Sequence, residues 1–157
     1  MLTTSPHFVP LETVLPGFVG QYEHQMDPKG RVSLPSAFRR EADGDRFVLL
    51  QWEPEYLTLF PETKWAEVQE NLLDFRRRDP KAWSHVRLII ANAVEVVPDK
   101  QGRILVPATL QAGAGLDGTV LLCGNIDRVE VWDPERYRAA VQGRPDELAQ
   151  FAHKLFG

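Results

Sequence analysis

Two arginines stand at the same point of a phrase that occurs twice in the chain. Arg31 ends the run Asp27-Pro28-Lys29-Gly30-Arg31, and Arg103 ends the run Asp99-Lys100-Gln101-Gly102-Arg103, 72 residues later. A guanidinium presents five N–H donors in a planar fork, which fits phosphate oxygens and the edge of a guanine base. The aspartates are placed to orient these forks. The spacing therefore indicates two exposed arginines, each following a tight turn, that can contact a nucleic acid.

A turn without any binding function would use some of the same residues. Aspartate accepts backbone N–H groups within a turn, and glycine takes a positive φ at low cost. The arginine would then pair with the aspartate or point to water. Such a turn needs the aspartate and the glycine but not the arginine. The recurrence of Arg31 as Arg103 therefore favours a contact function.

The likeness between the two halves extends beyond these turns. With an offset of 72 residues and no gap, further coincidences occur at Glu23/Glu95, Ala42/Ala114, Asp45/Asp117, Val48-Leu49-Leu50/Val120-Leu121-Leu122 and Phe60/Trp132. A fixed period of this length is typical of a duplicated supersecondary unit. Whatever one turn contacts, the chain has two such turns.

Each half is predicted to fold as two strands, a short helix and two more strands, closed by a longer helix. The fold class is therefore α+β. Alternating large side chains, the Asp–Gly turns and the prolines that precede helices set the limits of the elements. The first half has strands 18–26 and 31–34, helix 36–42, strands 47–52 and 56–60, and helix 62–78; the second has a strand around 94–96, strand 103–106, helix 108–113, and strands 119–123 and 128–132. Further helices are predicted from Pro80, Pro134 and Pro145.

The overall charge is unfavourable for nucleic-acid binding. The 157 residues carry a formal net charge of −4, so any such contact must rest on local basic patches. Two clusters are present in the sequence: Lys29, Arg31, Arg39 and Arg40, and then Arg76, Arg77, Arg78, Lys81 and Arg87. The alternative interpretation of each cluster is a solvated helix face.

Residue types that would indicate catalysis or metal binding are scarce. The four histidines lie far apart, without cysteine or carboxylate at metal-ligand spacing, and Cys123 is the only cysteine. No serine has the setting of a nucleophile elbow, and the glycine patterns of phosphate-binding loops are missing. We expect no enzyme activity, no metal, no cofactor and no small-molecule substrate. The lone cysteine suits a reducing compartment, and neither a secretory signal nor a membrane span is predicted.

Three segments resemble one known family. They are residues 20–39, residues 87–107 and the run Val129-Glu130-Val131-Trp132-Asp133, and they are similar to the corresponding parts of the MraZ family. The doubled Asp-x-x-x-Arg signature carries most of the likeness. The resemblance covers roughly residues 18 to 141.

The resemblance implies two AbrB-like (SpoVT-AbrB) modules of ββαββ topology that share swapped hairpins in a pseudo-two-fold barrel with packing helices. The expected divisions are an N-terminal extension 1–17, modules 18–66 and 92–138, connecting helices 67–91 and a C-terminal helix 139–157. It further implies a cytoplasmic, nucleoid-associated bacterial transcription regulator of the cell-division and cell-wall gene cluster. Such a regulator would bind short direct repeats in promoter DNA, its own promoter included, as a ring homo-oligomer.

The expected double-stranded DNA contacts are Lys29, Arg31, Lys100 and Arg103, supported by Asp27, Gly30, Asp99 and Gly102. Because Gln101 replaces Lys29 in the second turn, the two turns need not contribute equally. Two other classes remain open: an antitoxin-like protein-interaction module of the same fold, and a small-molecule or enzymatic barrel of swapped hairpins. The amphipathic C-terminal helix argues against the first, and the missing nucleophile and acid–base pair argue against the second.

Two further expectations concern the periphery of the chain. Residues 1–16 contain three prolines and no helical or strand periodicity, so we expect them to lie outside both modules. Trp65, Val68, Trp83 and Ile90 offer apolar faces larger than one small repeat can bury, which predicts self-association.

Overall fold

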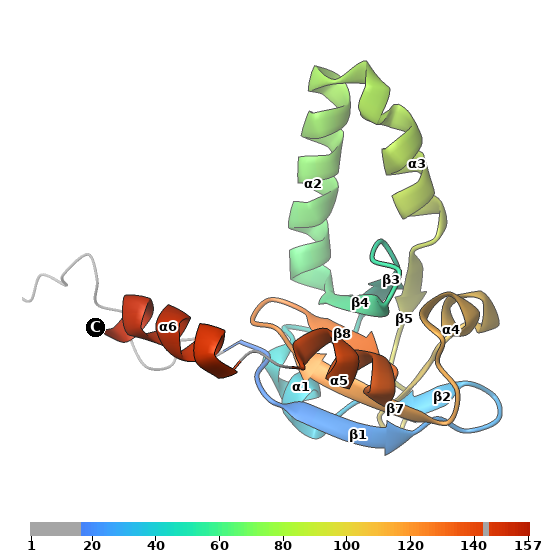
Figure 1. Ribbon diagram of the computed structural model, residues 1–157. Coiled ribbons are helices and arrows are strands. Elements are labelled where there is room, and N and C mark those ends of the chain that lie inside the picture. Colours follow the sequence, from blue (N-terminus) through green and yellow to red (C-terminus); the bar gives the residue numbers. More distant parts are fainter. Residues whose placement is uncertain (1–16, 143–144) are drawn as a thin grey trace, which may run out of the picture.

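A six-stranded antiparallel sheet and a separate two-stranded ribbon form the body of the protein, with helices around them (Figure 1). The computed structural model describes residues 17–142 and 145–157. The expectation for residues 1–16 lies outside the described residues. The fold class is α+β, as the sequence predicts.

The first half contains β1 (Gln21–Gln25), β2 (Arg31–Ser33), α1 (Ser36–Glu41), β3 (Phe47–Leu50), β4 (Tyr56–Pro61) and α2 (Glu62–Arg78). The 3-10 helix η2 (Pro80–Ala82) and α3 (Trp83–Ala91) lead to the second half, which contains β5 (Val94–Val96), β6 (Arg103–Leu105), α4 (Ala108–Ala114), β7 (Thr119–Gly124), β8 (Val129–Trp132), α5 (Pro134–Val141) and α6 (Pro145–Phe156). Each predicted strand and helix is present, with ends displaced by up to a few residues. The largest difference is in β1, which spans Gln21–Gln25 where the sequence predicts a strand over residues 18–26.

Helix starts follow the local chemistry. Asp79 accepts a hydrogen bond from the backbone N–H of Lys81, and Asp133 accepts one from Arg136, so both act as N-caps before a proline. Pro35 and Pro107 immediately precede α1 and α4 as N-cap residues. The missing N–H of proline costs nothing at a helix start.

The strands on either side of each Asp–Gly turn belong to different sheets. β1 pairs antiparallel with β7 of the other half, β5 pairs with β3, and β2 pairs with β6. The predicted turn is still closed by hydrogen bonds, from the N–H of Asp27 to the carbonyl of Arg31 and from the N–H of Gly30 to the carbonyl of Asp27. Each half therefore lends strands to the other.

The strand register has an internal two-fold relation. In the ribbon Val32 lies opposite Ile104, and in the sheet Thr58 lies opposite Glu130. Each pair consists of positions that correspond in the sequence repeat. The strand order β1-β7-β8-β4-β3-β5 also reads the same when the two halves are exchanged. A local two-fold axis therefore relates the halves.

One part of the gap-free alignment is wrong. The 72-residue offset matches Leu122 with Leu50. In the sheet Leu122 lies opposite Tyr22 and Val131, and the residue opposite their counterparts Val94 and Leu59 is Leu49. β3 is thus displaced by one residue against the repeat. The loop between β3 and β4 is longer than its counterpart between β7 and β8, and it restores the alignment at β4. Two similar Val-Leu-Leu runs concealed this shift.

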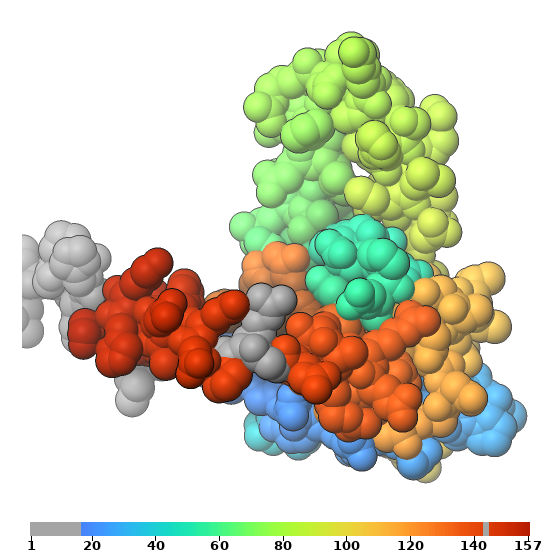
Figure 2. All heavy atoms as spheres, viewed as in Figure 1, coloured from blue at the N-terminus to red at the C-terminus, as the bar shows by residue number. Residues whose placement is uncertain are grey.

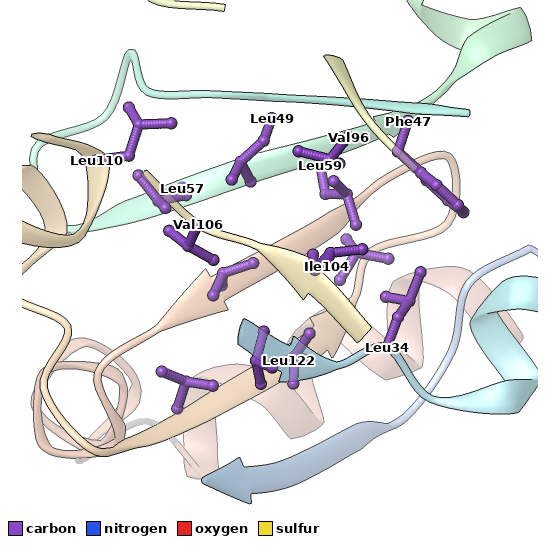
Figure 3. Packing of buried hydrophobic residues seen from close by; sticks show 14 of the residues in the cluster. Leu34, Phe47, Leu49, Leu57, Leu59, Val96, Ile104, Val106, Leu110 and Leu122 are labelled. Carbon is purple, nitrogen blue, oxygen red and sulfur yellow. The ribbon is translucent and has the colours of Figure 1, made fainter. Parts of the chain in front are cut away.

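The ribbon and one face of the sheet enclose the main core (Figure 3). Val32, Leu34, Ile104 and Val106 from the ribbon and its ends are at most 1% exposed. They pack with sheet residues that include Leu49, Leu57, Leu59, Leu122, Val129 and Val131. Side chains alternate between the faces of a strand, so the intervening residues face the other side.

Helices cover the second face of the sheet. Near the base of α2, Trp65 and Val68 pack against Val48, Leu50 and Phe60. At the other half Tyr137 of α5 packs against a cluster of Leu121, Cys123 and Trp132. Beyond its base, the α2–α3 pair projects from the sheet as an arm (Figures 1 and 2). No helix in the described ranges is long and apolar enough to span a membrane.

We expect Gly30→Ala to destabilise the fold more than Gly20→Ala. Both glycines have a positive φ, +88° and +85°, where a side chain costs about 1–2 kcal/mol. A Cβ on Gly20 would meet nothing within 4 Å, whereas one on Gly30 would lie 2.8 Å from the carbonyl oxygen of Val106. Urea unfolding should show a loss of about 1 kcal/mol for Gly20→Ala and about 3 kcal/mol for Gly30→Ala. Equal losses would contradict the close packing of the turn.

Candidate nucleic-acid interface

Each aspartate of the repeated turn holds both the backbone and the arginine that follows. Asp27 Oδ1 accepts hydrogen bonds from the backbone N–H groups of Lys29 (2.9 Å) and Arg31 (2.8 Å), and Oδ2 accepts one from Arg31 Nε (2.7 Å). Asp99 makes the same three contacts with Gln101 and Arg103, at 2.9, 2.9 and 3.0 Å. The Nε of each arginine is occupied, and its two Nη groups extend beyond the aspartate bond.

The pairing of β2 with β6 places the two turns side by side. The N–H of Val106 donates to the carbonyl of Gly30, and the N–H of Leu34 donates to the carbonyl of Gly102, each at 2.8 Å. Arg103 Nη1 lies 4.0 Å from Asp27 Oδ2, so the aspartate of the first turn also faces the arginine of the second. Residues 72 positions apart in the sequence thus share one surface.

Both arginines lie on the outer side of the ribbon. Val32 and Ile104 point into the core, so Arg31, Ser33, Arg103 and Leu105 occupy the opposite face. Lys29 and Lys100 are exposed at the turn tips, and Gly30 and Gly102 are buried beneath them. The structure therefore brings together all eight residues that the sequence singles out: Asp27, Lys29, Gly30, Arg31, Asp99, Lys100, Gly102 and Arg103.

Helix residues also reach this surface, and the sequence did not reveal their positions. Arg39 Nε donates to the carbonyl of Leu34 at 3.1 Å, and Gln111 Nε2 donates to the carbonyl of Val106 at 2.8 Å. Arg39 and Gln111 correspond in the repeat, as do Leu34 and Val106. The 72-residue offset of a polar pair was a signal that could have identified them.

The second basic cluster does not join this surface. Its residues lie on α2, η2 and α3, which cover or leave the opposite face of the sheet (Figure 1). The guanidinium of Arg76 stacks over the Trp83 ring at 4.2 Å, and Arg77 pairs with Asp74 at 3.7 Å. Arg76 and Arg77 are therefore engaged in contacts within the arm.

The aspartates are held in the ionised form. The pKa of Asp27 is lowered chiefly because its carboxylate accepts the backbone N–H of Arg31, with the Arg31 side chain adding to the effect. The pKa of Asp99 is lowered in the same way by the N–H of Arg103. Both carboxylates therefore stay charged across the neutral range and orient the arginines there.

The described histidine and cysteine side chains are not arranged for metal binding or for nucleophilic attack. Within the described residues no group of three or more histidine, cysteine or acidic side chains could hold a metal ion. Burial raises the pKa of the Cys123 thiol to about 12, which keeps it protonated and poorly nucleophilic. His24 is half-buried on β1 and belongs to no such group.

Comparison with known proteins assigns the family. A family model described as "MraZ protein, putative antitoxin-like" matches residues 18–87 and 89–154. The chain belongs to the MraZ family. The resemblance inferred from the sequence is thereby confirmed, and the matched ranges include both turns and the arm.

Relatives within the MraZ family carry the name transcriptional regulator MraZ. The protein of Desulforamulus reducens is 39% identical over 138 residues, which are 85% of this chain and 95% of the relative. That of Carboxydothermus hydrogenoformans is 37% identical over 140 residues, with 88% and 96% covered. That of Acetivibrio thermocellus is 40% identical over 124 residues, with 78% and 85% covered. The name denotes a regulator of transcription, which is not an enzyme class.

The turn aspartates give a prediction for acid stability. Their folded pKa values lie below the ordinary 3.8, so their contribution is complete above that value and is lost as pH falls through the folded pKa. NMR titration should place both carboxyls below 3.8. In urea unfolding, the free-energy gap between the wild type and the Asp27→Asn/Asp99→Asn variant should be constant from pH 7 to about pH 5 and narrow in stronger acid. A gap that stays unchanged at low pH would contradict the assignment.

Proposed function

We propose that the chain is a sequence-specific DNA-binding regulator of transcription that acts on promoter DNA of a bacterial cell-division and cell-wall gene cluster, its own promoter included. The observation that carries the proposal is the joint face of the two turns. There, two arginines held by aspartates lie side by side on an outward ribbon face. The names of the relatives support the same class of function.

Lys29, Arg31, Lys100 and Arg103 are the proposed DNA contacts. The two Nη groups of an arginine can form a bidentate pair with guanine or with a phosphate. The compact lysine ammonium suits phosphate. Asp27 and Asp99 orient the arginines, and Gly30 and Gly102 allow the tight turns. The protein would act in the cytoplasm, associated with the nucleoid.

In this proposal the halves are two AbrB-like modules, residues 18–66 and 92–138, whose exchanged hairpins form one pseudo-two-fold barrel. The exchange of strand partners and the two-fold register support this interpretation. Residues 67–91 connect the modules, residues 139–157 form a C-terminal segment, and residues 1–17 are an extension. A single chain then supplies the two-fold unit that would otherwise require a dimer.

Charge argues that one chain alone binds DNA weakly. The chain has a net charge of −4, and each phosphate that is neutralised adds only about −0.9 to the slope of log affinity against log salt. A ring homo-oligomer that meets several short direct repeats at once would raise the apparent affinity by about 10²–10⁴ without new contacts. Acidic surface elsewhere would limit indiscriminate binding.

Two exposed apolar surfaces are available for such an assembly. On the arm Trp83 is 46% exposed, Leu88 62% and Ile90 42%, whereas Trp65 and Val68 are half-buried against the sheet. Of the four residues named from the sequence, Trp83 and Ile90 therefore offer the larger free surface. The second surface is the stripe of Leu148, Phe151 and Leu155 on α6.

The alternative is an antitoxin-like protein-interaction module. It takes support from the family description and from the exposed stripe on α6, which could bind another protein. The two proposals differ in what the turns do. A gel shift with DNA from the region upstream of the chain's own coding sequence separates them, because only the regulator needs Arg31 and Arg103 for binding.

Arg31→Ala and Arg103→Ala should each weaken binding to this DNA by about 1–3 kcal/mol if the arginine reads a base edge. The double variant should lose specific binding. Arg87→Ala is the matched control, because it removes an exposed arginine from the arm. Far-ultraviolet circular dichroism should show that all variants fold. A folded double variant that binds with wild-type affinity would refute the proposal.

The chain should form an oligomer well above a dimer at micromolar concentration. Phe151→Asp/Leu155→Asp should shift the mass measured by light scattering towards the 17.8 kDa monomer, because a carboxylate on a buried interface is costly. Gln150→Asp/His153→Asp adds the same carboxylates at other positions of the same helix and serves as the control. A wild-type monomer that binds DNA tightly would contradict the role given to assembly.

A further inference from the structure

The two turns are not chemically equal, and the difference involves a residue outside them. The first turn has Lys29 where the second has Gln101. The helices that follow β2 and β6 differ at several corresponding positions, and one of these is Arg39 in α1 and Gln111 in α4. Each of these side chains reaches the turn of the other half.

The contacts of Arg39 and Gln111 follow the two-fold relation. Each side chain donates a hydrogen bond to the carbonyl of the residue before the proline of its own half, Leu34 or Val106. Each also covers the glycine of the opposite turn. A Cβ on Gly102 would lie 2.8 Å from Arg39 Cζ and 3.0 Å from its Nη2, and a Cβ on Gly30 would collide with Gln111 Nε2.

The guanidinium of Arg39 therefore lies directly beside Gly102, the residue that precedes Arg103 in the second turn. Its Nε donates a hydrogen bond to the carbonyl of Leu34, and the side chain is exposed to solvent. Arg31 and Arg103 are each paired with an aspartate, but no carboxylate in the described part of the chain lies within ion-pair distance of Arg39. Within residues 17–142 and 145–157 the charge of Arg39 is therefore not paired with a carboxylate.

We propose that Arg39 is a phosphate-binding residue of the second turn, where it places a cation beside Gly102 in addition to Lys100 at the tip. This inference rests on the proposed function, because it takes DNA as the ligand of the turn surface. The Nη groups of Arg39 bind a phosphate oxygen beside the base pair that faces Arg103. The first turn has only the neutral Gln111 at this place.

This arrangement makes the DNA-binding face directional. A face with full two-fold symmetry binds a site equally well in both orientations. Here each turn has a lysine at its tip, but the residue behind the first turn is the neutral Gln111 and the residue behind the second is Arg39. The second turn therefore has one more cation than the first, so the two orientations of a DNA site differ in energy.

Arg39→Gln tests the proposal and leaves the local structure intact. The variant reproduces the arrangement seen at Gln111, whose amide makes the corresponding bond to a backbone carbonyl. Binding to a 30-base-pair duplex of unrelated sequence is measured by fluorescence anisotropy at several salt concentrations, since phosphate contacts do not depend on sequence. We expect about tenfold weaker binding and a salt slope that is less steep by about 0.9.

Two matched variants make the result specific. Arg40→Gln removes the same charge from the neighbouring exposed position, and we expect a much smaller change in both affinity and slope. Gln111→Arg adds the cation to the first turn and should tighten binding and steepen the slope. Thermal unfolding should be the same for all three variants.

The outcomes separate this inference from the proposed function. If Arg39→Gln equals Arg40→Gln in affinity and slope while Arg31→Ala/Arg103→Ala abolishes binding, the role of Arg39 is refuted and the regulator remains. If the double arginine variant binds as well as the wild type, the DNA-binding function itself fails. A loss of thermal stability in Arg39→Gln without a change in salt slope would assign Arg39 a purely structural role.

Discussion

The antiparallel pairing of β2 with β6 is the contact on which the rest of the molecule depends. The ribbon is short, with three residue pairs, but its inward side chains lie in the centre of the main core. Burial of a Val, Leu or Ile side chain contributes about 1.5–3 kcal/mol, so Val32, Leu34, Ile104 and Val106 together are a large share of the stability of a domain of this size. Because the two strands come from opposite halves, this burial also joins the halves and brings the two turns together.

The aspartate–arginine pairs near these strands are better explained by binding than by stability. Ion pairs that remain accessible to water contribute little to stability, and the side chains of Arg31 and Asp27 are 35% and 27% exposed. The main effect of the pairs is to order the arginine side chains. Each carboxylate fixes two backbone N–H groups and one Nε, so the arginine is held in one orientation before any ligand arrives. Ordering a long side chain in advance removes part of the entropic cost of association.

Local features of the fold could be predicted from the residue pattern, whereas the exchange of strands between the halves was expected only from the family resemblance. The Asp–Gly turns, the N-caps Asp79 and Asp133 and the helix after each proline depend on neighbouring residues, so the sequence pattern identified them. The exchange of strand partners depends on which distant strand completes each edge, and alternation of side chains says nothing about that choice. The one-residue shift of β3 was hidden because the two Val-Leu-Leu runs look alike and a longer loop compensates. The sequence singled out the turn surface because six of its residues repeat, Asp27, Gly30 and Arg31 with Asp99, Gly102 and Arg103. Arg39 was noted only as one member of a basic cluster.

A chain that contains both halves of a two-fold unit is free to make them different. In a homodimer a substitution on one side of the axis appears on the other side as well. Here Lys29 corresponds to Gln101, Arg39 to Gln111 and Ser33 to Leu105. The residues that point into the core keep their apolar character in both copies, since Val32 matches Ile104 and Leu34 matches Val106. The differences are therefore concentrated on the outward face, where they do not disturb the shared core. Packing preserves the symmetry of the scaffold, and the surface that would meet a ligand is where the two copies have diverged.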